Sequence, residues 1–282
     1  MNNFTKRTIS SAVFLAVMLT ALLTNQYVYG AVMLFILVVM MWEFLKMTCG
    51  TEYRYSQILS IIAGATMFIM SYLYKGFGMP GRFIVLSLIP LFILMINSLY
   101  VKDKTRFAKF ACLYTSILYI AIPWTMLNYT VFSNGGNYSG INLLCFFAIV
   151  WGSDVGAYIF GVTLGQKYGK KLFPSISPKK SWIGFWGGLF CTIAVCLALY
   201  FTGVCAYVGL EKMTWYHAIL LAIVIDVAGV YGDLFESQWK RYYAVKDSGT
   251  AIPGHGGFLD RLDSTLFAVP AGVIYLTIFN LF

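Results

Sequence analysis

The residues that could do chemistry gather near the C-terminal end of this sequence. Of its 11 acidic residues, six lie between positions 226 and 263: Asp226, Asp233, Glu236, Asp247, Asp260 and Asp263. Carboxylate oxygens are hard ligands that suit Mg²⁺, an ion that keeps several waters and works with phosphate-containing substrates. The clustering therefore predicts a divalent-metal site.

Helical spacing would bring these side chains onto shared faces. One helical face would carry Asp226, Asp233, Ser237, Lys240 and Arg241. Asp260 and Asp263 are three residues apart and would share a face of a second helix. We expect the two helix ends to point carboxylates at a common space.

A glycine-rich segment, Pro253-Gly254-His255-Gly256-Gly257, lies between these two helices. Glycine permits tight turns, and successive N–H groups in such turns can bind phosphate oxygens. Positive charge in the same stretch comes from Lys240, Arg241, Lys246 and Arg261. Phosphoryl-type transfer needs mainly positioning and charge neutralisation. The combination of carboxylates, basic side chains and a glycine-rich segment therefore fits that class of reaction.

Each of these features also has a simpler interpretation. A glycine-rich loop is commonly only a turn, and carboxylates near a membrane surface can belong to a solvated helix end. Lys240 and Arg241 could serve as a membrane anchor. The density of all three features between Ser237 and Asp263 favours the functional interpretation.

The elements that must position these residues are membrane helices. Of the 282 residues, 60% are hydrophobic and 11% are charged, and the mean hydropathy is +0.76. A soluble fold cannot bury that much apolar surface, since soluble domains carry about 25% charged residues. Inside lipid every backbone polar group must be paired within the segment, which favours helices. The predicted fold class is an all-α polytopic integral membrane protein.

Apolar runs long enough to cross a ~30 Å hydrocarbon core predict about nine transmembrane helices. They cover residues 8–25, 28–47, 57–74, 83–100, 108–132, 141–164, 182–205, 215–236 and 263–281. Residues 24–27 offer no small-x-small cleavage site, so we expect the first run to be a retained span rather than a cleaved signal peptide.

The positions of the basic residues predict the orientation. With the N-terminus in the cytoplasm, only Lys75, Arg82 and Lys212 of the 20 Lys and Arg residues fall outside. This asymmetry follows the positive-inside rule. It places the polar loops 165–181 and 237–262 in the cytoplasm, where the net charge of +9 is consistent with anionic ligands.

We expect a single membrane domain over residues 1–282. Residues 1–135 would form an N-terminal scaffold with few polar features, and residues 136–282 would form the catalytic spans. The six cysteines show no C-x-x-C spacing, which favours packing roles over disulfide or zinc sites.

The stretch from Ser237 to Asp263 resembles the signature of the phosphatidate cytidylyltransferases, also called CDP-diacylglycerol synthases. That family pattern reads S-x-x-K-R-x4-K-D-x-x-x-x-x-P-G-H-G-G-x-x-D-R-x-D, and every fixed position is met here. The likeness is close in the C-terminal half of the chain, whereas in the N-terminal half it extends only to hydropathy.

The resemblance implies transfer of a cytidylyl group from CTP to phosphatidate, giving CDP-diacylglycerol and pyrophosphate. Asp233, Asp260 and Asp263 would hold Mg²⁺, and a monovalent cation such as K⁺ could lie beside it. Other catalytic positions would be Ser237, Lys240, Arg241, Lys246, Asp247, His255 and Arg261, and the substrate would also contact Gly254, Gly256 and Gly257. A phosphate monoester is already an anion, so for His255 we favour phosphate hydrogen bonding over general-base catalysis.

A second region, Ser177 to Gly184, resembles the family's S-P-K-K-[ST]-x-E-G box. It adds Lys179, Lys180 and Ser181 as substrate-binding candidates. Ile183 departs from the pattern, because the family usually has Glu at this position, so the role of that carboxylate is open in this chain.

The segment that begins at Asp154 resembles the family's D-x-x-A-Y-x-x-G stretch, which makes Asp154 a further substrate-binding candidate. Gly152 and Gly156 flank this aspartate. Small residues let membrane helices approach closely, so these two glycines have an alternative role in packing alone.

Rival classes predict other features. A secondary transporter would show inverted repeats, and a P-loop enzyme would show G-x-x-x-x-G-K-[ST]; neither is present. A sister cytidylyltransferase that acts on another lipid phosphate is the nearer alternative. We expect CTP, phosphatidate and the bilayer as partners, no nucleic acid, and a possible homodimer. The expected location is a bacterial inner (plasma) membrane, with the active site facing the cytoplasm.

Overall fold

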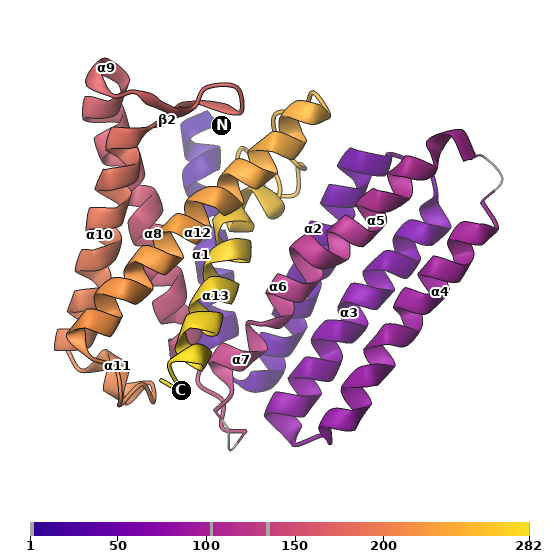
Figure 1. Cartoon of the computed structure of the whole chain (residues 1–282), viewed down its shortest axis with the longest axis horizontal. Helices are drawn as coiled ribbons and strands as arrows, with labels where there is room; N and C mark the ends of the chain where they lie inside the picture. Colours follow the sequence, from indigo (N-terminus) through magenta and orange to yellow (C-terminus); the bar gives the residue numbers. More distant parts are fainter. Residues whose placement is uncertain (1–2, 102–103, 134–135, 282) are drawn as a thin grey trace. The chain divides into compact units, whose positions relative to one another are not determined.

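The computed structural model describes residues 3–101, 104–133 and 136–281 (Figure 1). Within these residues, nine helices are long and apolar enough to cross a membrane. They agree with the nine predicted runs and with the predicted all-α polytopic class. The ends of the predicted spans differ from the ends of these helices by a few residues.

The chain divides into two compact units, each of which is described by itself. The first contains residues 1–140 and 243–262, and the second contains residues 141–242 and 263–282. The candidate loop after residue 242 therefore belongs to the first unit, whereas the helix before it belongs to the second. This division does not test the predicted single membrane domain, which stays a prediction.

The first unit consists mainly of helices that follow one another along the chain (Figure 1). Its long helices are α1 (Asn3–Leu23), α2 (Gln26–Cys49), α3 (Arg54–Phe77) and α4 (Leu88–Leu99), with the 3₁₀ helix η1 (Gly81–Ser87) before α4. The fifth span is interrupted and consists of η2 (Lys104–Lys109), α5 (Phe110–Ser116), the π-helical η3 (Ile117–Ala121), α6 (Ile122–Thr125) and α7 (Asn128–Val131).

The second unit contains most of α8 (Gly140–Phe160), which continues through the π-helical η4 (Gly161–Gly165) into α9 (Gln166–Tyr168). The other helices are α10 (Trp182–Phe201), α11 (Val204–Tyr207), α12 (Trp215–Tyr242) and α13 (Leu259–Ile278), whose first turn lies in the first unit. The predicted loop 165–181 contains a small antiparallel hairpin, β1 (Lys171–Phe173) with β2 (Ser177–Ser181).

Helix α2 forms the core of the first unit. Its side chains of Met33, Leu37 and Met40 are fully buried. The indole N–H of the buried Trp124 donates to the carbonyl of Met33 at 2.8 Å, so the one polar atom of this large side chain is paired. Pairing of this kind is needed because a buried polar group without a partner is costly.

Close helix packing in the second unit depends on small residues, which is the alternative role that the sequence left open for Gly152 and Gly156. A Cβ added to Gly156 of α8 would lie 2.8 Å from the carbonyl oxygen of Gly187 and 2.7 Å from the Cβ of Cys191, both on α10. The hydrophobic effect contributes little to the association of helices within a membrane. Close van der Waals contact of this kind therefore supplies much of the stability of the helix packing.

One buried carboxylate links three helices of this unit. Asp226 of α12 is 1% exposed, and its Oδ1 accepts hydrogen bonds from Ser153 of α8 at 2.5 Å and Thr192 of α10 at 3.0 Å. The sequence had placed Asp226 on one helical face with Asp233. Its bonds show that it takes part in helix packing.

We predict that Gly156→Ala destabilises the second unit by about 1–3 kcal/mol, because the new methyl group overpacks the contact between α8 and α10. Thermal unfolding of the detergent-solubilised protein measures this effect. Gly161→Ala is the matched control, since its nearest new contact would be 3.8 Å away, at the Cα of Gly184. Equal unfolding temperatures for the two variants would contradict the close approach.

Candidate functional site

The glycine-rich segment of the first unit forms a tight turn. The N–H of Ile252 donates to the carbonyl of Gly256 at 2.8 Å, and the N–H of His255 donates to the carbonyl of Ile252 at 3.0 Å. Gly254 and Gly256 have φ values of +79° and +88°, which favour glycine over other residues. The sequence prediction of a tight turn at these glycines is therefore confirmed.

Helix α1 supports this turn from within the same unit. Ser10 Oγ donates to the carbonyl of Pro253 at 2.8 Å, and the rings of Phe14 and Phe258 lie 6.0 Å apart. The turn is thus held by residues distant in sequence, which the local motif alone does not reveal.

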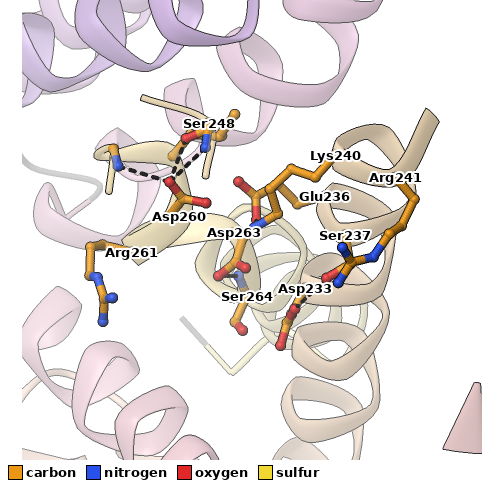
Figure 2. Close-up of polar contacts among 12 residues, drawn as sticks. Asp233, Glu236, Ser237, Lys240, Arg241, Ser248, Asp260, Arg261, Asp263 and Ser264 are labelled. Carbon is orange, nitrogen blue, oxygen red and sulfur yellow. Dashed lines mark hydrogen bonds and ion pairs between the residues drawn. The ribbon is translucent and has the colours of Figure 1, made fainter. Parts of the chain in front are cut away.

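Asp260, in the first turn of α13, is held by three donors. The N–H and the hydroxyl of Ser248 and the N–H of Gly257 each donate to Asp260 Oδ2 at 2.8 Å (Figure 2). Hydrogen bonds of this charge-assisted kind stabilise the ionised form and fix the plane of the carboxylate. Oδ1 takes no part in these three bonds.

Gly256 and Gly257 are needed beside this aspartate for steric reasons. A Cβ on Gly256 would lie 2.6 Å from Asp260 Oδ2, and a Cβ on Gly257 would lie 2.6 Å from Ser248 Oγ. Both distances are shorter than real side chains tolerate. The glycines therefore let the backbone approach Asp260 closely enough to donate.

His255 and Arg261 belong to the same unit. His255 Nε2 is hydrogen-bonded to Ser11 Oγ at 3.2 Å, and Arg261 donates to the carbonyl of His255 at 3.1 Å. In the part of the chain that the structure describes, the buried His255 Nδ1 has no hydrogen-bond partner. Burial, and then the positive charges of Arg261 and Arg7, lower the pKa of His255.

Lys246 and Asp247 lie on the same loop, after the end of α12, and both are exposed. The Cβ of Asp247 is close to Gly256, at 3.2 Å from the position where a Cβ on that glycine would stand. Both side chains are therefore on the solvent side of the turn, available to a charged ligand.

The second unit holds Asp233 between a cation and a hydroxyl. Lys180 Nζ lies 2.7 Å from Asp233 Oδ2. Ser237 Oγ donates to Asp233 Oδ1 at 3.2 Å, one helical turn along α12 (Figure 2). Lys180 comes from β2. The hairpin that the sequence did not predict thus brings one motif residue to another.

Two further basic residues of α12 have partners within the second unit. Lys240 forms an ion pair with Glu236, which is fully buried, one turn earlier on the helix (Figure 2). The exposed Arg241 donates through Nε to the carbonyl of Ile176, in the turn between β1 and β2, at 3.1 Å. These contacts tie the end of α12 to the hairpin.

Asp263 lies among other charges of the second unit. Gly232 of α12 approaches α13 so closely that an added Cβ would lie 2.6 Å from the carbonyl oxygen of Asp263. The Asp263 carboxylate interacts electrostatically with Asp233, Glu236, Asp154 and Lys240. Three of these four neighbours are acidic, so a bound cation would relieve their mutual repulsion.

The donor set fits Mg²⁺ in chemical type. Over the residues described, neither unit by itself gathers three His, Cys, Asp or Glu side chains into a metal-binding group. Mg²⁺ does not require such a cage, because it is commonly held by one or two carboxylates, waters and substrate phosphates. Asp263 and Asp233 in one unit and Asp260 in the other are carboxylates of this kind. Whether the three share one ion stays a prediction.

The remaining motif residues lie near the start of α10 and on α8. Ser181 is 3% exposed and accepts a hydrogen bond from Gly184 N at 3.1 Å, so it caps the N-terminus of α10. Lys179 is exposed, and its carbonyl accepts a hydrogen bond from the side-chain amide of Gln166 at 2.9 Å. Asp154 is exposed on α8, and Ile183 is half-buried in the first turn of α10.

Sequence reasoning missed Glu43, which lies in the part expected to have few polar features. Glu43 is on α2, is 5% exposed, and accepts a hydrogen bond from the N–H of Leu259 at 3.0 Å. A signal was present, because Glu43 is the one acidic residue in the predicted span 28–47. An ionisable residue at membrane depth is a functional candidate by default.

The two sets of residues suit a reaction at phosphorus. The first unit offers an immobilised carboxylate and a turn with backbone N–H groups, and the second offers carboxylates interleaved with lysines. Neutralising the charge of phosphates and of a leaving pyrophosphate requires such a mixture.

Comparisons with known proteins agree with this chemistry. Residues 5–279 match the model of the "Cytidylyltransferase family". Curated relatives named phosphatidate cytidylyltransferase include those of Staphylococcus haemolyticus (strain JCSC1435), 39% identical over 179 residues, and Staphylococcus aureus (strain COL), 40% identical over 181 residues. In each case the similar segment covers 64% of this chain and 64% of the relative's own length.

We predict that protonation of His255 destabilises the folded protein. Its folded-state pKa lies below its usual value of about 6.5, so the unfolded chain binds more protons in the window below that value, and stability falls as the pH falls through it. NMR titration of labelled histidines should give a lower pKa for His255 than for a free imidazole. His255→Gln should flatten the pH dependence of unfolding in this window, and an unchanged slope would argue against the assignment.

Proposed function

Because the chain belongs to the cytidylyltransferase family, we propose that it is a phosphatidate cytidylyltransferase of phospholipid biosynthesis. It would convert CTP and phosphatidate into CDP-diacylglycerol and pyrophosphate. The names of the curated relatives support this substrate pair.

The observation that carries the proposal is the pairing of motif residues around Asp233. Lys180 from the second motif and Ser237 from the first both contact this carboxylate, at 2.7 Å and 3.2 Å. Two sequence motifs that are separate in the chain therefore contribute to one polar cluster, as a shared substrate site requires. A packing role alone would not need a cation, a hydroxyl and a carboxylate together at this point.

The reaction would proceed by direct displacement. An oxygen of the phosphatidate phosphate forms a bond to the α-phosphorus of CTP, and the bond from that phosphorus to the β-phosphate oxygen breaks, which releases pyrophosphate. A phosphate monoester is already an anion, so no protein base has to remove a proton first. No covalent intermediate with the protein is needed.

Asp233, Asp260 and Asp263 would hold Mg²⁺, and a monovalent cation such as K⁺ could lie beside it. When bound, Mg²⁺ supplies charge neutralisation for the phosphates and the leaving pyrophosphate. The three backbone and hydroxyl donors on Asp260 Oδ2 hold that carboxylate in one orientation. Lys180 and Ser237 likewise hold Asp233.

The basic and glycine-rich residues would contact phosphates. These are Ser237, Lys240, Arg241, Lys246, Arg261, Lys179 and Lys180, with the N–H groups at Gly254, Gly256 and Gly257. Asp154, Ser181 and Asp247 would complete the pocket. His255 is suited to donate from Nδ1, because a hydroxyl lies at its Nε2 and Nδ1 has no other hydrogen-bond partner among the described residues.

The membrane setting follows from the apolar helices and the distribution of basic residues. We place the chain as a multi-pass protein in the cell inner membrane, with its N-terminus and the loop 237–262 on the cytoplasmic side, where CTP is available. The glycine-rich spans are compatible with a homodimer.

The test is a radiolabel assay with purified protein in mixed micelles. Label from α-³²P-CTP should enter a lipid-extractable product when phosphatidate and Mg²⁺ are present, and EDTA should abolish this incorporation. Matched micelles that carry an isoprenoid-ether phosphate are the control for a sister enzyme. Faster incorporation into that lipid would identify it, in place of phosphatidate, as the substrate. No incorporation into either lipid would refute the proposed activity.

We predict that Asp260→Asn and Asp263→Asn each lower this incorporation at least about 100-fold, because each variant weakens the binding of the Mg²⁺ that would neutralise charge in the transition state. Membrane insertion and thermal unfolding should change little. Glu211→Gln is the control, since Glu211 is an exposed carboxylate outside both motifs. Substantial activity in both aspartate variants would remove these residues from the metal site.

A further inference from the structure

Glu43 stands out among the buried charged residues that neither motif contains. It lies on α2, within an apolar span, and is 5% exposed. A carboxylate at such a position is costly, and an apolar residue would pack at lower cost. Its surroundings in the first unit show what it contacts.

The Glu43 carboxylate contacts the loop 243–258 and the start of α13. Glu43 Oε2 accepts a hydrogen bond from the N–H of Leu259 at 3.0 Å, and the N–H of Phe258 also approaches the carboxylate. Leu259 is the first residue of α13.

Because the first N–H groups of a helix have no partners within it, a carboxylate there both satisfies a donor and interacts favourably with the helix dipole.

Two glycines of the loop fit around the same carboxylate. A Cβ on Gly249 would collide with Glu43 Oε1, and a Cβ on Gly257 would collide with Glu43 Oε2. Gly249 follows Ser248, and Gly257 is itself a donor to Asp260. Glu43 therefore contacts the immediate chain neighbours of the donors that orient Asp260.

The other carboxylate oxygen of Glu43, Oε1, is buried and has no hydrogen-bond partner among the described residues. Half of the carboxylate's hydrogen-bonding capacity is thus unused, although burial of a charged oxygen is unfavourable. The described contacts of this carboxylate all go to the loop and the start of α13, so the buried group acts on those two segments.

We propose that Glu43 is a positioning residue for the proposed reaction, and that it acts by clamping Ser248, Gly257 and the first turn of α13 so that Asp260 is oriented to bind a divalent cation. This inference rests on the proposed function, because it assumes that Asp260 is a metal ligand. Glu43 itself contacts the loop and not the substrate. Residues that orient a metal ligand typically change metal affinity about 10–100-fold when they are replaced.

The experiment measures Mn²⁺ binding by electron paramagnetic resonance on purified, full-length protein without nucleotide or lipid. Glu43→Ala should raise the dissociation constant about 10–100-fold. Glu43→Gln keeps an acceptor oxygen for the N–H of Leu259 and should recover most of the affinity. Activity of Glu43→Ala should return at saturating Mn²⁺, which a simple loss of folded protein would not allow.

A second variant approaches the same contact from the loop. Gly249→Ala keeps an ordinary backbone conformation but places a methyl group against Glu43 Oε1, so it should weaken Mn²⁺ binding in the same way. This variant keeps the test decisive if Glu43→Ala does not fold. Glu52→Gln is the matched control, because it removes a carboxylate of the same unit whose described ion pair is with Lys109.

The outcomes separate the two proposals. Suppose that Glu43→Ala and Gly249→Ala bind Mn²⁺ within twofold of the wild-type affinity, while Asp260→Asn binds it clearly more weakly. This result would overturn the role of Glu43 and leave the proposed function standing. Unchanged affinity in Asp260→Asn would overturn the metal assignment of Asp260, and the role of Glu43 with it. Weakened binding in all three, with Glu52→Gln unaffected, supports the clamp.

Discussion

A carboxylate on a membrane helix needs donors or cations around it, because the hydrocarbon interior offers no water to solvate a charge. In the first unit, Asp260 is surrounded by three donors and Glu43 lies at the N-terminus of α13. In the second unit, Asp233 pairs with Lys180, and Glu236 pairs with Lys240. These partners determine where the acidic residues can stand, and the hairpin and the glycine-rich turn supply many of them.

The same constraint separates two kinds of intramembrane carboxylate. Asp226 is bonded only to hydroxyl groups among the contacts described, and those groups come from two neighbouring helices, so its role is to hold three helices together. Asp263 instead faces three other carboxylates and a single lysine. An excess of like charge is unfavourable for packing, and a bound cation would relieve it. The type of neighbour, more than the presence of an acidic residue, therefore separates Asp226 from the carboxylates proposed to bind a metal.

Sequence reasoning was most successful where the physical signal is local. Apolar length predicted the nine candidate membrane helices found among the described residues, and the glycines around His255 predicted a tight turn, which the structure forms with positive φ at Gly254 and Gly256. The contact between Lys180 and Asp233 could not be derived by spacing, because it depends on a hairpin whose strands are short and polar. Glu43 was missed because its partners lie more than 200 residues away in the chain, although it was visible as the one acidic residue of the predicted span 28–47.

The way α13 begins has a consequence for the proposed metal ligands. Asp260 lies in the first turn of α13, in the same unit as Glu43, so its place depends on the position and rotation of the helix start. The bond from Leu259 to Glu43 constrains that start directly, and the three bonds to Asp260 constrain the rotation of its side chain. A few contacts at one helix terminus can therefore set the start of α13 and the orientation of Asp260 together, which is the role proposed for Glu43.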